Sequence, residues 1–193
     1  MSRFSDIISV HEAYRVARRL KEVERYGEVA GRRESAAEHV FSSMVLARLL
    51  LPKVSAELDE HHVLLLLLYH DLVESEAGDV FILDEDESKE AREDEAARAI
   101  RDRLPAKVSE EFWSCWREFC GQSSLEARFV KAVDQLDPMF HSLEQPELWA
   151  RYGFTAEKLR DKKGSYMKAF PELERLFEDL LAYAEERGII PVR

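Results

Sequence analysis

Four side chains that could bind a metal ion stand in segments that otherwise have the apolar periodicity of buried helices. They are His39, the adjacent pair His70 and Asp71, and Asp134. A buried imidazole or carboxylate needs compensation, because an unpaired charge there costs several kcal/mol or shifts its pKa until it is neutral. Imidazole and carboxylate ligands together suit divalent Mn, Fe, Co, Ni or Zn, and two of each leave room for water. The residue types therefore indicate an open, catalytic kind of metal site.

Two more carboxylates follow the His70–Asp71 pair. Glu74 comes three residues after Asp71 and four after His70, so a helix through this segment would place all three on one face. One turn beyond the metal, Glu74 is better placed for proton transfer than for direct metal binding. Asp79 follows Gly78 and is expected on a turn near the same site.

A purely structural role would also account for the same residues. A His-Asp dipeptide alone is a weak signal, and one histidine beside an apolar stripe is usually a hydrogen-bonded core or cap residue. We interpret His11, His61 and His62 as structural residues near the surface. His141 lies two helical turns after Asp134 and is expected on the outer part of its helix.

The order of these residues resembles the HD-domain metal-dependent phosphohydrolases, and within them the 5'-deoxynucleotidase-like group. That group's pattern is roughly ESVAEHS, ALxHDxxExxxGD and QSSxEAKFVKxLDQ. This chain has ESAAEHV, LLYHDLVESEAGD and QSSLEARFVKAVDQ at those places, and the resemblance covers roughly residues 10 to 145. The last segment is the most specific, because its match extends well beyond the metal ligands.

The resemblance implies one divalent metal ion, with Mn, Co, Fe, Ni, Zn and Mg left open. It implies Glu74 as the catalytic acid or base. Dinuclear HD proteins place extra histidines before the final aspartate, and no histidine lies between Asp71 and Asp134 here, so a second metal ion would need His141. The implied metal ligands are His39, His70, Asp71 and Asp134.

The resemblance also assigns residues to the substrate. Asp79 matches the aspartate of the family's Gly-Asp turn, which acts at the substrate or leaving-group end. Arg25 falls where the family has an Arg-Trp or Arg-Thr element that contacts the phosphate. Because Tyr26 replaces the Trp, Arg32 and Arg33 are alternatives for this phosphate contact.

The activity implied is metal-dependent hydrolysis of (deoxy)nucleoside 5'-monophosphates to nucleoside and phosphate. One alternative is a metal-retaining nucleotide-binding regulatory module without efficient catalysis, and another is a helical interaction protein without a metal. The formal net charge of -11 argues against a sequence-independent grip on nucleic acid. An anionic nucleotide would therefore need a metal or a few local cations.

Apolar residues at helical spacing recur along the whole chain and predict an all-α fold, which the resemblance specifies as a single-domain HD-type helical bundle. We expect one domain over residues 1–193, with a metal-binding core at about 25–145 and C-terminal helices at 155–187 packing on it. YGEVAGRR is expected to be a loop. Capping boxes are predicted at Ser35–Glu38 and Ser123–Glu126. Expected helices cover about 4–23, 35–51, 58–74, 84–104, 110–120 and 123–143, then two from Thr155 that meet at Pro171 and end at Gly188.

Cys115 and Cys120 are five residues apart on a predicted helix, which disfavours a local disulfide and fits a reducing compartment. No export signal or membrane span is suggested, so a cytoplasmic protein is expected. A homodimer is also expected, because the family commonly pairs and EEFWSCWREFC is rich in aromatic side chains. The alternative is that these rings, Phe112, Trp113, Trp116 and Phe119, pack on the core.

Overall fold

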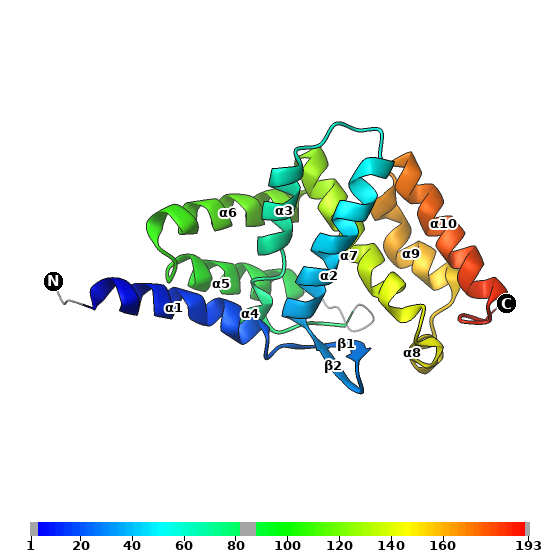
Figure 1. Cartoon of the computed structure of the whole chain (residues 1–193), viewed down its shortest axis with the longest axis horizontal. Helices are drawn as coiled ribbons and strands as arrows, with labels where there is room; N and C mark the ends of the chain where they lie inside the picture. Colours follow the sequence, from blue (N-terminus) through cyan, green and yellow to red (C-terminus); the bar gives the residue numbers. More distant parts are fainter. Residues whose placement is uncertain (1–3, 82–87, 192–193) are drawn as a thin grey trace. The chain divides into compact units, whose positions relative to one another are not determined.

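The computed structural model describes residues 4–81 and 88–191, and almost all of its regular structure is helical (Figure 1). The predicted all-α fold class is confirmed. The chain divides into two compact units, Met1–Phe41 with Leu65–Gly121, and Ser42–Leu64 with Gln122–Arg193. The expected single-domain organisation over residues 1–193 stays a prediction.

The first unit holds the N-terminal helix, a short hairpin and the helical pair α5 and α6. Helix α4 contacts both α1 and α5, and α5 packs along α6 (Figure 1). The elements wholly within this unit are α1 (Ser5–Leu20), β1 (Glu24–Val29), β2 (Arg32–Ser35), α4 (Glu74–Ala77), α5 (Lys89–Arg101) and α6 (Ala106–Gly121).

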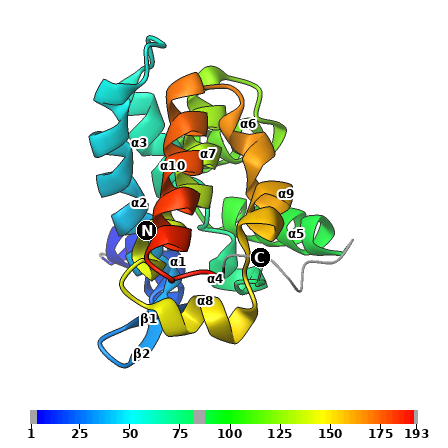
Figure 2. The same ribbon diagram turned by 90° about the vertical axis from the view of Figure 1, so that its right-hand side faces the viewer.

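The second unit is built around α7, against which α8 and α9 pack, and α9 and α10 lie side by side (Figure 2). Its complete elements are η1 (Leu51–Lys53), α7 (Leu125–Ser142), α8 (Pro146–Tyr152), α9 (Ala156–Met167) and α10 (Pro171–Glu186). Helix α9 begins after Thr155, whose hydroxyl accepts from the Lys158 amide at 3.2 Å, and α10 begins at Pro171. Both starts match the predicted ones.

Helix α2 (Ala36–Leu50) begins at the predicted capping box. The Glu38 carboxylate accepts from the Ser35 backbone amide at 2.9 Å, and the Ser35 hydroxyl accepts from the Glu38 amide at 3.3 Å. These reciprocal bonds satisfy backbone donors that lack partners within the helix. The cap fixes where α2 starts, and therefore where its fourth residue, His39, is placed.

Helix α3 (Glu60–Tyr69) ends earlier than predicted. The segment after Tyr69 forms tighter turns, in which the amide of Leu72 donates to Tyr69 and that of Glu74 donates to Asp71, each three residues back. A separate short helix, α4, then begins at Glu74. The prediction of one helix through residue 74 is therefore wrong, and the metal-ligand pair lies in a turn.

The segment predicted as a loop is an antiparallel hairpin. Val29 pairs with Arg32 and Glu28 with Arg33, and an irregularity follows before Glu24 pairs with Ser35. Its two turn residues, Ala30 and Gly31, have φ angles of 50° and 78°, as a tight hairpin turn requires. Alanine is unusual in that conformation, so the sequence carried no standard hairpin signal.

Three other expectations need adjustment. Ser124, and not Ser123, caps α7, with its hydroxyl accepting from the Ala127 amide at 3.0 Å. Helix α6 is longer than the aromatic segment, and α8 was not predicted. The expected helix at 84–104 starts partly outside the described residues, which show α5 from Lys89.

The two cysteines are unbridged, as expected. None of the helices in the described ranges combines the length and the apolar character that a membrane span requires.

Candidate metal and phosphate site

Three of the predicted metal ligands meet within the first unit. His39 comes from the first turn of α2, and His70 and Asp71 from the turn after α3. The Nε2 atoms of His39 and His70 each lie 3.4 Å from the same atom, Oδ2 of Asp71. Both imidazoles are buried, at 0% and 1% exposure, so water does not screen this arrangement.

The protonation of His70 follows from its backbone contact. Its Nδ1 lies 2.8 Å from the carbonyl oxygen of Leu67, and a carbonyl can only accept, so Nδ1 carries the proton. In the neutral ring, Nε2 then presents a lone pair toward the Asp71 carboxylate. Two electron-rich atoms at 3.4 Å repel unless a cation lies near both, and this is the arrangement that a metal-binding histidine adopts.

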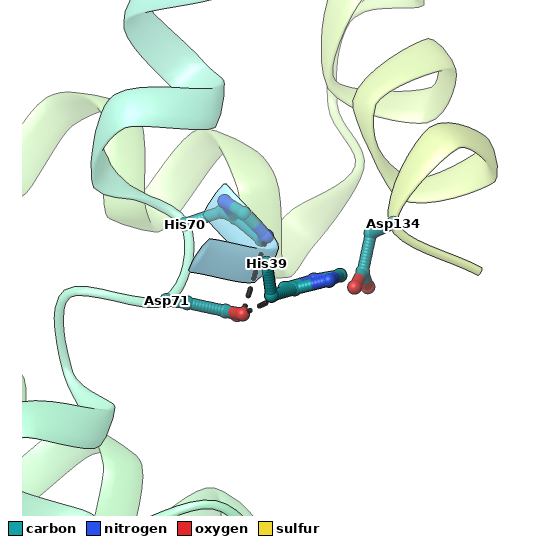
Figure 3. A group of neighbouring side chains, drawn as sticks. All are labelled: His39, His70, Asp71 and Asp134. Carbon is teal, nitrogen blue, oxygen red and sulfur yellow. Dashed lines mark ion pairs between the residues drawn. The ribbon is translucent and has the colours of Figure 1, made fainter. Parts of the chain in front are cut away.

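Asp134 lies in α7 of the second unit and is 8% exposed. Its Oδ2 accepts from Lys131 Nζ at 2.9 Å and from Gln135 Nε2 at 3.1 Å. Figure 3 draws the four predicted ligands, with dashed lines for the ion pairs that Asp71 makes with His39 and His70 in the first unit. The residue types of all four suit a divalent metal ion.

Arg25 on β1 contacts three carboxylates of the first unit. Its Nη1 lies 3.3 Å from Asp71 Oδ2, 3.4 Å from Glu74 Oε1 and 3.2 Å from Asp79 Oδ1. The four side chains are only 10–15% exposed. The hairpin, which was expected to be a loop, thus places Arg25 next to Glu74 and Asp79, the predicted catalytic residues.

The two alternative arginines are engaged elsewhere. Arg32 is exposed and donates two bonds to the Glu38 carboxylate. That arginine and the cap at Ser35 lower the pKa of Glu38 to about 2. Arg33 donates to the Tyr26 carbonyl at 3.0 Å, and its guanidinium lies 5.2 Å from the centre of the Tyr26 ring.

Glu74 is the first residue of α4 and is 8% exposed. Burial raises the pKa of this carboxyl well above its usual value, and the charges of Asp71 and Asp79 raise it further, against the opposing charge of Arg25. Its Oε2 atom is buried and has no hydrogen-bond partner among the described residues. The environment therefore favours the neutral acid, which can hold a proton for transfer.

Asp79 follows Gly78, whose backbone conformation requires a glycine. Gly78 has a φ of +76°, in the region that side-chain-bearing residues rarely adopt. Just beyond the turn, Phe81 stacks on Tyr26 with ring centres 4.1 Å apart and an interplanar angle of 25°. This contact, which no sequence motif indicated, ties the turn of Asp79 to the hairpin of Arg25.

The other histidines lie where the structural interpretation put them, or close to it. His11 and His61 are exposed, while His62 and His141 are half-buried. The backbone amides of His61 and His62 both donate to the Asp59 carboxylate at the start of α3, at 2.9 and 3.1 Å.

The aromatic segment of α6 is mostly buried in the chain. Phe112, Trp116 and Phe119 are 0%, 4% and 8% exposed, and Trp113 is half-buried. Core packing therefore describes the first three rings, which do not form the exposed aromatic surface expected from the sequence.

Comparisons with known proteins agree on one family. Residues 17–174 match the family model described as HD domain. The chain is 32% identical to human 5'-deoxynucleotidase HDDC2 over 90% of this chain and 85% of that protein, and 30% identical to the bovine protein of that name over 87% and 82%. The crystal structure of a predicted metal-dependent phosphohydrolase from Magnetospirillum magnetotacticum MS-1 superposes with a TM-score of 0.87, at 31% identity and 97% coverage of both chains.

Proposed function

Because the chain belongs to the HD domain family and is a phosphohydrolase of that fold, we propose that it hydrolyses (deoxy)nucleoside 5'-monophosphates to nucleoside and phosphate. The family resemblance inferred from the sequence motifs is confirmed by the family match. The proposed substrate draws support from the names of the human and bovine relatives, which are 5'-deoxynucleotidases.

The observation that carries the proposal is the position of Asp71. Its Oδ2 lies 3.4 Å from two buried imidazole nitrogens and 3.3 Å from Arg25. We propose that His39, His70, Asp71 and Asp134 hold one divalent metal ion, chosen from Mn, Co, Fe, Ni, Zn and Mg. When bound, such an ion would polarise a phosphate oxygen and supply a water nucleophile near neutral pH.

The protein's own residues would handle the charge and the proton. The Arg25 guanidinium, already next to the carboxylates, would turn a donor toward the phosphoryl oxygens and offset their charge. Glu74, kept neutral by its surroundings, would give its proton to the leaving 5'-oxygen of the nucleoside. Asp79, at 3.2 Å from Arg25, would orient that guanidinium at the substrate end.

The test is phosphate release from a panel of deoxy- and ribonucleoside 5'-monophosphates. Chelator-stripped protein is supplied in turn with Mn, Co, Fe, Ni, Zn or Mg, beside an Asp71→Ala variant as the control. Metal-dependent release that is lost in the variant supports the proposal and identifies the preferred base and sugar. Nucleotide binding without release under any metal would instead indicate a regulatory module.

We further propose that the protein forms a homodimer through α1. Only two α1 residues are buried, Val16 and Leu20, whereas Ile7, Ile8 and Tyr14 are 67%, 56% and 56% exposed. Exposed apolar side chains gathered on one helix are typical of an interaction surface, so a partner that covers this part of α1 is favoured. A second copy fits this face, because α1 has Asp6 in its first turn and Arg18 and Arg19 in its last turn. An antiparallel pair of these helices would bring the opposite charges together.

Sedimentation velocity at micromolar concentration tests the dimer. An Ile7→Lys variant should sediment as a monomer if α1 forms the interface, while Leu125→Lys, at an exposed apolar residue of α7, should not change the association state. A wild-type protein that sediments only as a monomer would refute the dimer. The cytoplasmic location stays a prediction.

A further inference from the structure

Three residues of α6 form a surface that faces the end of α3 and the turn carrying His70. They are Glu111, Phe112 and Phe119, called here the α6 face. Phe112 and Phe119 are seven residues apart, two helical turns, and therefore lie on one side of the helix. The α6 face belongs to the aromatic segment that the proposed reaction does not otherwise use.

Phe119 contacts a proposed metal ligand directly. Its ring meets the His70 imidazole in a T-shaped arrangement, with ring centres 5.4 Å apart and planes at 70°. A second constraint on the imidazole is the 2.8 Å contact of its Nδ1 with the Leu67 carbonyl oxygen. A hydrogen bond at one ring nitrogen and an aromatic contact together restrict rotation of the ring, and so fix the direction in which Nε2 points.

The residue before His70 is held by the same face. The Tyr69 hydroxyl donates to the Glu111 carboxylate at 2.8 Å, and its ring packs T-shaped on Phe112 with centres 5.7 Å apart. Tyr69 is the last residue of α3 and is 7% exposed. The His70 amide still donates to the Leu66 carbonyl at 2.9 Å, but beyond it the backbone bonds of Leu72 and Glu74 reach only three residues back. The side-chain contacts of Tyr69 therefore add a constraint where the α-helical ladder ends.

We propose that the α6 face positions the His70–Asp71 turn for metal binding. In this role Phe119, Tyr69 and Glu111 are positioning residues, which act through His70 and touch neither substrate nor metal. The inference rests on the proposed function, since it concerns the metal ligands assigned there. Its physical content is that preorganised ligands bind the ion more tightly than ligands that must first be ordered.

The experiment measures metal binding directly, by isothermal titration calorimetry of Co²⁺ into chelator-stripped protein. Phe119→Leu and Tyr69→Phe should weaken Co²⁺ binding by about 10- to 100-fold, the usual effect of removing a group that orients a ligand. Phe119→Tyr keeps the ring and should retain wild-type affinity. Asp71→Ala gives the value for a disrupted site.

The matched control is Phe177→Leu. Phe177 is a 1% exposed phenylalanine of α10, a helix that carries none of the proposed ligands. This variant should lower the melting temperature, because it loses buried volume as Phe119→Leu does, but it should leave the Co²⁺ dissociation constant unchanged. A purely structural role of the α6 face would instead give the same Co²⁺ affinity in all folded variants.

The outcomes separate the inference from the proposed function. Wild-type Co²⁺ affinity in both Phe119→Leu and Tyr69→Phe would overturn the inference while leaving phosphate release by the wild-type protein as it was. Tight Co²⁺ binding by the wild type without phosphate release would refute the proposed reaction, yet the comparison of affinities would still decide the inference. If Phe119→Leu fails to fold, Tyr69→Phe, which removes one oxygen atom, decides alone.

Discussion

Replacing Glu74 by glutamine would separate the acid chemistry of this residue from its shape. The side chain is buried, its Oε1 lies 3.4 Å from Arg25, and its Oε2 has no hydrogen-bond partner among the described residues. Glutamine fills the same space but cannot transfer a proton. Positioned general acids contribute about 10²- to 10⁴-fold to rate, so we expect Glu74→Gln to lower kcat by that factor, about 3–5 kcal/mol in the barrier.

In the metal-free protein, Glu74→Gln should be more stable than the wild type above the ordinary pKa of glutamate, and the difference should grow as the pH rises. Burial and the Asp71 charge raise the pKa of folded Glu74 above the ordinary value of 4.5, which the unfolded chain retains. Between these two pKa values the folded state binds more protons than the unfolded state, so the free energy of unfolding falls with increasing pH. Below the unfolded pKa both states are protonated and the penalty vanishes. Each pKa unit between the two states is worth about 1.4 kcal/mol, and Glu74→Gln carries no such penalty.

Three measurements check this reasoning: phosphate release at saturating Co²⁺, Co²⁺ affinity, and urea unfolding of metal-free protein at acidic and alkaline pH. Glu76→Gln is the control, because Glu76 lies on the same short helix but pairs with Arg19 and Arg103. Glu74→Gln should keep Co²⁺ binding, lose turnover and unfold with a flatter pH dependence than the wild type. Unchanged kcat, or a pH dependence of unfolding equal to that of the wild type, would refute the assigned role.

Other predictions concern separate parts of the chain. Arg25→Lys should raise KM for the nucleotide at least about tenfold in steady-state assays, because an ammonium cannot bind phosphate in the bidentate way, and should leave Co²⁺ affinity at least as tight by calorimetry. Ser124→Ala should lower the free energy of unfolding by about 1 kcal/mol in urea, whereas Ser123→Ala, one residue before the cap, should leave it nearly unchanged. Burial raises the pKa of the Cys115 thiol to about 11, so a maleimide at mildly alkaline pH should label the native protein at exposed Cys120 alone, and both thiols after unfolding; equal labelling of both in the native state would contradict this.

Features that depend on local rules were predictable from the sequence. The cap at Ser35 and Glu38 follows from residue types three apart, and it sets the start of α2 with His39 in its first turn. The starts of α9 and α10 follow in the same way, from the capping hydroxyl of Thr155 and from the missing amide hydrogen of Pro171. The four ligand candidates came from polar residues at the edges of apolar segments, and the motifs then placed them in a known order.

Features that depend on tertiary contacts were not predictable in this way. Helix α3 could have continued to residue 74 by propensity alone, but it stops at Tyr69, where the hydroxyl of that residue reaches Glu111. The hairpin requires Ala30 at a φ of 50°, which only its surroundings can favour. Both features bear on function, because the turn holds His70 and Asp71 and the hairpin holds Arg25, the proposed phosphate-binding residue.

The charge balance around Arg25 explains why a neutral Glu74 matters for substrate binding. Arg25 faces three carboxylates, those of Asp71, Glu74 and Asp79, in a chain whose net charge is already -11. With Glu74 protonated, the remaining two carboxylates exceed the arginine by one charge, which a divalent ion more than offsets, so an anionic phosphate can enter. With Glu74 ionised, the added negative charge opposes the phosphate and competes with it for Arg25. KM for the nucleotide should therefore rise as pH increases through the ionisation of Glu74. Measured at saturating Co²⁺, this rise should be absent from the residual activity of Glu74→Gln, and a KM that follows pH equally in both proteins would place the titrating group elsewhere.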